Sequence, residues 1–476
     1  MQFFDWLTLI LAVLISGAGA AHALLNKRDP RAALGWIVVC LLFPPVGAFL
    51  YFLFGINRVR TQARKLSPMH PADLKSGITD TEQILSSWNS SSEINAAFAP
   101  VSRLSASVSK RPLLPGNQVR VLANGEQVFP AMLDAIKQAS HKVYLSTYIF
   151  ETNRTGKEFI QELALARKRG VDVRVLLDGI GELYSFPRVS WLLQKESIPV
   201  GKFLPPKLFP PSVHINLRNH RKLLVVDGQR GFTGGINIGD RHLVDLDKPG
   251  RVQDLHFMFS GPIVLEMEQV FLADWGVSTG EYESALSNVS SKIGQSQCRV
   301  LVDGPDEDLD KLAMVLVGAV SAARARIKIM TPYFLPSREL IGALQAASLR
   351  GVEVTIILPE KNNLPYVKWA SNNMLWELLK EDVRIFFQPP PFNHSKLFLI
   401  DDFYTLVGSA NLDPRSLRLN FEVAVEVFDP ELAAKLDVHF QTILSRSRQT
   451  SLSEMDGRSL PVRLRDSVCW LFMPYL

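Results

Sequence analysis

The feature that most constrains the fold of this chain is an α/β unit that occurs twice. The strand-like segment 142–148 is matched by 326–333, and each copy continues through a helix-period stretch to a glycine, Gly170 or Gly351, and a β-branched run. A glycine at this junction is typical of a helix that feeds a buried strand. Because each copy is one supersecondary unit, the sequence predicts two tandem α/β lobes related by a pseudo-twofold axis. We place these lobes at 116–290 and 291–476.

Each copy also contains the motif H-x-K-x(4)-D, followed at equal spacing by a glycine turn and an asparagine. The residues are His220, Lys222, Asp227 and Asn237 in the first copy and His394, Lys396, Asp401 and Asn411 in the second, all separated by 394 − 220 = 174 positions. One such motif has a chance on the order of one in fifty and is a weak signal, whereas two in register are a strong one. Since side chains alternate along a strand, the histidine and lysine of each motif lie on one face.

Two histidines, two lysines and two asparagines indicate chemistry at a phosphate group. Imidazole, with an ordinary pKa of about 6.5, is either a neutral nucleophile or a protonated acid near neutral pH. One of His220 and His394 can attack phosphorus while the other protonates the departing oxygen and then activates the incoming hydroxyl. The lysines supply positive charge, and we predict that Asn237 and Asn411 help to bind the phosphate oxygens. No metal is required, and we expect no cofactor, because the sequence lacks ligand spacings such as H-E-x-x-H.

Four acids accompany these motifs. A nucleophilic imidazole needs an acceptor for its other nitrogen, and each lobe offers an acid downstream of its motif, Asp254 in the first and Glu422 in the second. The motif acids Asp227 and Asp401 count with the histidines and lysines as the predicted catalytic set. Because they end the buried strand, we assign them to local structure or site electrostatics rather than to proton transfer.

Two apolar runs open the chain. No Asp, Glu, Lys or Arg occurs from Trp6 to Leu25, about the length a helix needs to cross a bilayer, and a second uncharged run covers 32–56. We predict a membrane hairpin over residues 1–60, with transmembrane helices at about 6–25 and 32–56. Pro44 and Pro45 must kink the second helix or make it re-entrant, since neither can donate a backbone hydrogen bond.

A cleaved signal peptide is the competing interpretation of the first run, because the small residues at 21–23 resemble a cleavage site. A retained anchor is favoured, since the residues before the run contain no Lys or Arg and the second span follows at once. Basic residues after the second span slightly outnumber those between the spans, which favours cytoplasmic lobes. The Ser-, Pro- and Asn-rich residues 61–115 are predicted to be a linker.

Composition narrows the function further. The 52 basic and 47 acidic residues give a net charge of only +5, which is no footprint of a nucleic-acid partner. A hydrophobic share of 47% excludes overall disorder and suits a globular protein attached to a membrane. The three scattered cysteines are too few for a disulfide framework or a four-ligand zinc site.

The paired H-x-K-x(4)-D-x(6)-G-[GS]-x-N sequences resemble the phospholipase D superfamily. The stretches Asn216–Lys222 and Asn393–Lys396, with the turn Asn26–Pro30, resemble bacterial cardiolipin synthases in particular, and the similarity covers nearly the whole chain. The resemblance implies two phospholipase D-like lobes with one active site between them. It also implies metal-free phosphatidyl transfer through a phosphatidyl-histidine intermediate, from one phosphatidylglycerol to a second, with glycerol leaving.

Carried over by position, the resemblance implies His220 as the nucleophile and His394 as the general acid and base, with Asp254 and Glu422 as orienting partners. The near symmetry of the motifs leaves the reverse assignment of the histidines open. Phosphatidylglycerol and other phospholipids are the implied partners, and the implied location is the bacterial inner membrane, with a multi-pass anchor. The second lipid, phosphatidylglycerol or phosphatidylethanolamine, the acyl-chain preference and the oligomeric state stay open.

Three alternatives remain from the residues alone. A membrane-bound phospholipase D on the same scaffold would hydrolyse phospholipids or exchange their headgroups. A nuclease would need a basic groove, which neither the net charge nor the anchor indicates. A non-catalytic membrane scaffold would not need intact histidines and lysines in both lobes.

Overall fold

The computed structural model describes residues 3–27, 29–56, 96–206, 217–245, 250–283, 291–304 and 310–473. The chain divides into two compact units, residues 1–65 and 66–476. Residues 61–95 of the predicted linker lie outside the described residues, as does Asn216 of the motif region.

The larger unit is built on one mixed sheet of fifteen strands among the described residues. The first lobe contributes, outward from the centre, β1 (Leu114–Ala123), β8 (Leu255–Ser260), β6 (Arg230–Gly234), β5 (Leu223–Val226), β2 (Lys142–Thr147), β3 (Asp172–Asp178) and β4 (Val200–Phe203). The second contributes β9 (Ser296–Asp303), β16 (Glu422–Phe428), β15 (Tyr404–Gly408), β14 (Leu397–Ile400), β10 (Arg326–Met330), β11 (Glu353–Pro359), β12 (Arg384–Gln388) and β17 (Arg448–Gln449). Apart from β17, the two orders are the same, so the repeat found in the sequence is a repeat of the fold.

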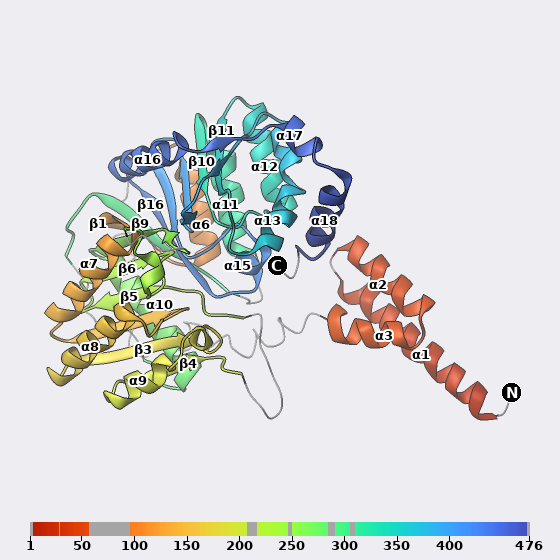
Figure 1. The fold of residues 1–476 in the computed structure, drawn as a ribbon, viewed down its shortest axis with the longest axis horizontal. Coiled ribbons are helices and arrows are strands. Elements are labelled where there is room, and N and C mark those ends of the chain that lie inside the picture. Colours follow the sequence, from red (N-terminus) through yellow and green to blue (C-terminus); the bar gives the residue numbers. More distant parts are fainter. Residues whose placement is uncertain are drawn as a thin grey trace. The chain divides into compact units, whose positions relative to one another are not determined.

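The lobes join at the centre of the sheet, where β1 pairs antiparallel with β9. Within each lobe, β2, β3 and β4 or β10, β11 and β12 run parallel, while β5 and β14 are antiparallel to β2 and β10. Figure 1 shows the first lobe in orange to green and the second in cyan to blue.

Helices cover both faces of the sheet. One face carries α10 (Ile263–Thr279) and α16 (Pro430–Leu444), which share a single hydrophobic core with strands of both lobes. On the other face, each lobe has its own core, under α7 (Asn124–Gln138), α8 (Arg154–Lys168) and α9 (Val189–Lys195) in the first, and under α11 (Lys311–Ala322), α12 (Arg338–Leu349), α13 (Pro365–Asn372) and α14 (Leu375–Leu379) in the second. The shared core therefore holds the two lobes together as one body.

The glycines that end α8 and α12 occupy the position that the sequence indicates. Gly170 and Gly351 have φ angles of 89° and 87°, in the left-handed region that a glycine enters without steric cost. The chain then turns directly into β3 and β11. The C-terminal part of the larger unit adds α15 (Pro414–Arg418), α17 (Leu452–Asp456) and α18 (Leu460–Leu471).

Helix α6 (Ala99–Ser109) lies in the segment predicted as a linker, yet it packs into the core of the second lobe. Beneath it, Arg299 and Glu426 form a buried ion pair with 2.7 Å between nitrogen and oxygen. Ser105 donates to Glu426 at 2.8 Å, and Arg299 donates to the carbonyl of Ser102 at 2.7 Å. The chain thus enters the second lobe before it forms the first.

The smaller unit contains α1 (Phe3–Asn26) and α2 (Pro30–Leu42), which pack against each other. Asp29 caps α2, since its carboxylate accepts from the backbone amides of Arg31 and Ala32. The second helix, expected at 32–56, is divided at Pro44 and Pro45, and it resumes as α3 (Val46–Leu50) and a π-helical turn at 51–55. Among the described residues, the one helix long and apolar enough to cross a membrane is Trp6–Asn26, with a mean hydropathy of 2.0.

Candidate active site

The predicted histidines lie at equivalent places, three residues before the first residue of a strand that is buried on both faces. His220 leads into β5 and His394 into β14. The side chain of the asparagine before each histidine accepts a hydrogen bond from the backbone amide of the residue after it. Asn219 accepts from Arg221 at 3.1 Å, and Asn393 accepts from Ser395 at 2.9 Å. Each histidine is therefore held in a tight local turn at the end of the sheet.

The backbone of each histidine is fixed by the opposite lobe. The amide of His220 donates to the carbonyl of Phe421 at 2.9 Å, and that of His394 donates to the carbonyl of Gln253 at 2.7 Å. The second contact continues as a short parallel ladder between β7 (Val252–Gln253) and β13 (Phe392–Asn393). These contacts close the two lobes around the site.

The histidine side chains are also held across the lobes. Nδ1 of His220 lies 3.0 Å from the carboxylate of Glu422, and Nδ1 of His394 lies 2.8 Å from Oδ2 of Asp254. Both carboxylates are fully buried. The pKa of Glu422 is lowered, so this carboxylate is ionised and accepts from Nδ1 of His220. From the sequence, the acid expected for each histidine was the one downstream in its own lobe. In the structure, each histidine is instead bound by the acid of the opposite lobe. The reason is the cross-lobe ladder, in which each acid directly follows the carbonyl that binds the opposite histidine.

The two carboxylates are supported differently. Ser409 donates to Glu422 at 2.5 Å. The equivalent position in the first lobe is Gly235, where an added Cβ would lie 2.4 Å from both oxygens of Asp254. Asp254, the shorter acid, thus occupies the space beside Gly235, whereas Glu422, the longer acid, accepts a hydrogen bond from Ser409. The half-sites are similar in plan but differ in chemistry.

Burial and charge set the protonation of these groups. Burial lowers the pKa of His220 more than Glu422 raises it, so the imidazole is neutral near pH 7. Burial opposes the ionisation of Glu422, but His220, Lys222 and Ser409 together bring its pKa below the usual value. Nδ1–H of His220 therefore faces an ionised carboxylate. Burial first, and then Lys396 and Lys222, lower the pKa of His394 far below that of a free imidazole.

The motif lysines lie beside their own histidines. Nζ of Lys222 donates to the carbonyl of His220 at 2.7 Å, and Nζ of Lys396 donates to that of His394 at 2.5 Å. Nζ of Lys396 also lies 2.9 Å and 3.1 Å from the ring nitrogens of His394. Burial lowers the pKa of Lys222 to about 7 and that of Lys396 to about 8. Their charges are therefore sensitive to pH within the physiological range.

This sensitivity predicts an alkaline limit to activity. An ammonium that binds phosphate must be protonated, so kcat/KM should fall as the pH rises through about 7 to 8, where Lys222 and Lys396 lose their charge. A bound phosphodiester favours the charged lysines, so kcat should fall only at higher pH than kcat/KM. The measurement is a pH profile of both parameters, and coincident alkaline limbs, or none for kcat/KM, would contradict this expectation.

The motif acids lie away from this cluster, at the far ends of β5 and β14. Asp227 accepts from the backbone amides of Ser140, His141 and Lys142, and Asp401 accepts from those of residues 324–326. Both acids have left-handed φ angles, 54° and 51°. Of the two roles considered for them, the contacts correspond to local structure. The predicted catalytic set thus separates into a site group and two backbone clamps.

Replacing either clamp should therefore affect stability more than chemistry. We expect Asp227→Ala to lower the free energy of unfolding by about 2 kcal/mol, because three backbone donors lose their acceptor. Thermal unfolding measures this loss, and kcat at a temperature where the variant is folded should stay within a few-fold of the parent value. A large fall in kcat without a loss of stability would instead place Asp227 in the chemistry.

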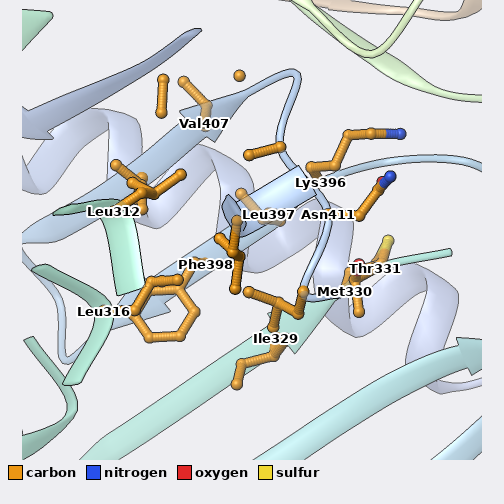
Figure 2. A pocket seen from close by; sticks show the side chains of 16 residues that line it. Leu312, Leu316, Ile329, Met330, Thr331, Lys396, Leu397, Phe398, Val407 and Asn411 are labelled. Carbon is orange, nitrogen blue, oxygen red and sulfur yellow. The ribbon is translucent and has the colours of Figure 1, made fainter. Parts of the chain in front are cut away.

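Both histidines line one pocket of about 420 Å³, together with the predicted phosphate ligands Asn237 and Asn411. Asn237 accepts from the backbone amide of Ile149 at 3.2 Å, and Nδ2 of Asn411 donates to Ser416 at 3.1 Å. Behind the second half-site lies an apolar cluster, and Figure 2 shows the nitrogens of Lys396 and Asn411 pointing away from it. Lys396 and Asn411 therefore lie between this apolar cluster and the polar site.

Four further residues belong to this pocket but were missed in the sequence. The ring of Tyr148 lies edge-on to His220 with 5.2 Å between centroids, and Tyr333 lies edge-on to His394 at 6.2 Å. Arg241 and Arg415 also line the pocket. The arginines had a detectable signal, because 415 − 241 = 174 repeats the offset of the motif.

A pocket lined by two carboxylate-held imidazoles, each with a motif lysine beside it, is suited to nucleophilic displacement at a phosphodiester. Among the described residues, no group of three or more His, Cys, Asp or Glu is placed to hold a metal ion. The fold and the site therefore define the class of protein: a two-lobed α/β protein with a site for reactions at phosphodiesters.

The comparisons with known proteins identify its family. The family model described as cardiolipin synthase, PLD-like domain, matches residues 132–275 and 316–444, and a phospholipase D-nuclease N-terminal model matches 7–55. The major cardiolipin synthase of Bacillus subtilis is 30% identical, with 100% of this chain and 98% of the relative covered. Cardiolipin synthase 2 of Bacillus anthracis is 32% identical, over 95% of this chain and 88% of the relative. The chain belongs to the phospholipase D-like cardiolipin synthase family.

A solved structure shares the fold. The phosphatidylserine synthase of Haemophilus influenzae superposes with a TM-score of 0.62 at 17% identity, covering 79% of this chain and 100% of that protein. At this identity the likeness concerns the fold alone.

Proposed function

We propose that this protein is a cardiolipin synthase that joins two phosphatidylglycerol molecules and releases glycerol. The observation that carries the proposal is the meeting of His220 and His394 in one pocket, each held by a carboxylate of the opposite lobe. Full-length relatives named as cardiolipin synthases support the choice of substrate and product.

In the first half-reaction, Nε2 of His220 attacks the phosphorus of one phosphatidylglycerol. The bond from phosphorus to the terminal glycerol oxygen breaks, that oxygen takes a proton from His394, and glycerol leaves. Both imidazoles are neutral, but His220 is the better nucleophile because the pKa of its partner Glu422 lies below the usual value, whereas burial raises the pKa of Asp254, the partner of His394. The ionised Glu422 stabilises the positive charge that develops on the ring of His220. The product of this step is a phosphatidyl-histidine.

In the second half-reaction, the terminal hydroxyl of another phosphatidylglycerol gives its proton to His394 and attacks the same phosphorus. The phosphorus–nitrogen bond breaks and cardiolipin is released. His394 must be protonated for the first step, although burial and the lysines disfavour that state. The negative charge of the bound phosphodiester offsets them, so lipid binding and protonation of His394 are coupled.

The proposed location is the bacterial cytoplasmic membrane, with a multi-pass anchor in residues 1–60 and the lobes on the cytoplasmic side. Helix α1 is long enough to span, and α2 with α3 would complete a second passage as a broken helix. Confinement to the bilayer raises the local concentration of lipid hydroxyls, which favours transfer to lipid over transfer to water.

The test is an assay of the purified full-length protein with phosphatidylglycerol labelled in its acyl chains and its terminal glycerol. Cardiolipin and free glycerol should form in equal amounts. Phosphatidic acid as the sole lipid product would identify a hydrolase and defeat the proposal, as would the absence of any turnover.

A further inference from the structure

Cardiolipin synthesis consumes two anionic lipids, but the paired histidines act on the phosphorus of only one. The phosphate of the second lipid must approach a pocket that already holds a negative charge. We propose that Arg241 binds the phosphodiester of the acceptor lipid and so selects an anionic acceptor over neutral alcohols. This inference rests on the proposed function and adds a second phosphate subsite to it.

Three arginines line the pocket: Arg218, which is buried and paired with Asp178, and the equivalent residues Arg241 and Arg415. Arg241 belongs to a short 3-10 helix at 240–242, and Arg415 belongs to α15. Each of these two arginines lies four residues after the asparagine of its lobe, Asn237 or Asn411. The 3-10 helix of Arg241 contacts β7, whose ladder with β13 leads directly into His394. Residues 419–421, which follow α15, bind the backbone of residues 217–220 and so place Arg415 toward His220. Arg241 is therefore the pocket arginine on the side of His394, whereas Arg415 and Arg218 lie on the side of His220.

The direction of displacement decides which arginine meets the acceptor. In an in-line reaction at phosphorus, the leaving oxygen departs opposite the nucleophile, and the incoming oxygen arrives by the same path. With His220 as nucleophile, both glycerol groups therefore occupy the side of His394. The acceptor phosphate is joined to its glycerol by one ester bond, so it also lies on this side, where Arg241 lines the pocket.

Arg241 is prepared for this role by its surroundings. Its Nε donates to Oε1 of Glu151 at 2.6 Å, and its Nη2 donates to the same oxygen. This contact fixes the guanidinium plane at the pocket rim, where 37% of the side chain is exposed. A guanidinium has five N–H donors, so others remain for a phosphate oxygen. Arginine suits the task because its fork matches two oxygens of one phosphodiester.

The experiment compares two acceptors for one phosphatidyl-enzyme. Full-length protein is given phosphatidylglycerol and labelled free glycerol, and the ratio of cardiolipin formed to labelled glycerol incorporated into lipid is measured. Glycerol is neutral and returns by the reverse of the first half-reaction. Arg241→Gln should lower this ratio about 10- to 100-fold, the effect of losing charge-assisted hydrogen bonds.

Glu151→Gln is the matched variant. It removes the charge of Glu151 but keeps a side-chain oxygen that accepts from Arg241, so the guanidinium stays in place and the ratio should stay at the parent value or rise. An ion pair with a merely structural role would respond equally to both changes, and equal effects on the ratio would overturn the inference. A lower ratio of cardiolipin to incorporated glycerol in Arg415→Gln, with an unchanged ratio in Arg241→Gln, would also overturn the inference. Parent protein that makes no cardiolipin defeats the proposed function itself, whereas cardiolipin with an unchanged ratio in Arg241→Gln defeats only this inference.

A second observation, independent of the pocket chemistry, concerns the C-terminal helix α18. Leu460, Leu464, Val468 and Leu471 recur at helical spacing, and each is more than half exposed. The opposite side packs inward, where Asp466 is fully buried and paired with Arg458 and Arg465. A contiguous apolar stripe of this kind marks an interaction surface.

The surroundings of α18 indicate what this surface contacts. Exposed Arg463 and Arg465 flank Leu464, so the stripe is bordered by positive charge. The helix packs against α13, which lines the lipid pocket through Tyr366 and Val367, and the guanidinium of Arg465 lies 4.3 Å from the ring of Trp369 on α13. We propose that α18 lies in the interface of a bilayer with anionic headgroups, next to the pocket wall.

The test places a spin label at residue 464 in the full-length protein, with Val438→Cys on α16 as the matched control, since Val438 is also apolar and 68% exposed. Both variants carry Cys469→Ser, because the other two cysteines are buried. In bilayers of equal phosphatidylglycerol and phosphatidylcholine, oxygen should reach the label at 464 better than a water-soluble nickel complex, with the reverse at 438. Equal aqueous access at both positions would overturn the proposal. A label at 464 shielded from both agents would also overturn it, because protein would then cover the stripe.

Discussion

Replacing His220 with asparagine is expected to lower kcat for cardiolipin formation roughly 10⁴-fold and to abolish the covalent phosphatidyl-enzyme. Asparagine keeps a polar side chain beside Glu422 but has no nucleophilic nitrogen, because the lone pair of its amide nitrogen is delocalised. The measurement combines steady-state turnover with acid-quenched detection of labelled lipid bound to protein. Thermal unfolding of the variant provides the control for folding.

His394→Asn is the informative partner of this variant. It keeps the nucleophile but removes the acid and base, so turnover should fall about 10²- to 10⁴-fold while covalent labelling stays detectable at long times. The double variant should be no slower than His220→Asn, since residues that act as a unit are not additive. Covalent label that survives in His220→Asn and vanishes in His394→Asn would reverse the two assignments.

Glu422→Gln is expected to reduce kcat roughly 10³- to 10⁴-fold although residue 422 does not touch the phosphorus. The amide removes the charge that stabilises the developing imidazolium. It can also donate to Nδ1, which moves the proton of His220 to Nε2 and blocks the attacking lone pair. The measurement is kcat with the rate of covalent labelling, and a wild-type labelling rate would exclude Glu422 from the first half-reaction.

Ser409→Ala provides a graded control for this effect. It removes one hydrogen bond to Glu422 but leaves the carboxylate, so turnover should fall only about 10-fold. The alkaline limb should keep its place in Ser409→Ala but move to lower pH in Glu422→Gln, because the charge of Glu422 raises the pKa of Lys222 and Lys396. A Ser409→Ala enzyme as slow as Glu422→Gln would mean that the serine itself takes part in the reaction.

The sequence was sufficient to predict the two-lobed fold because its repeats fall on structural equivalents. The strands at 142–147 and 326–330 and the glycines 170 and 351 occupy matching places in the two lobes. It was less informative for α6, because the residues that bury this helix, Arg299 and Glu426, lie far along the chain. Local composition carries no record of such a distant contact.

The same limit applies to the site. The alternation of side chains along a strand and the constant offset between the motifs identify His220, His394 and their neighbours. No sequence pattern indicates which acid binds which histidine. That choice depends on short parallel contacts such as those of Gln253 with His394, which are too brief to leave a periodic signal. The offset does contain Arg241 and Arg415, and extending the motif by four residues would have found them.

The exchange of carboxylates between lobes has a consequence for how such a protein can originate. A single lobe expressed alone would hold a histidine without its acid and an acid without its histidine. A one-lobe ancestor would thus have been competent only as a symmetric homodimer, with two copies completing each other. Gene duplication and fusion would make that partnership permanent and free each half to diverge. The two halves already differ in this way at one equivalent position, where Gly235 leaves space for Asp254 and Ser409 donates to Glu422.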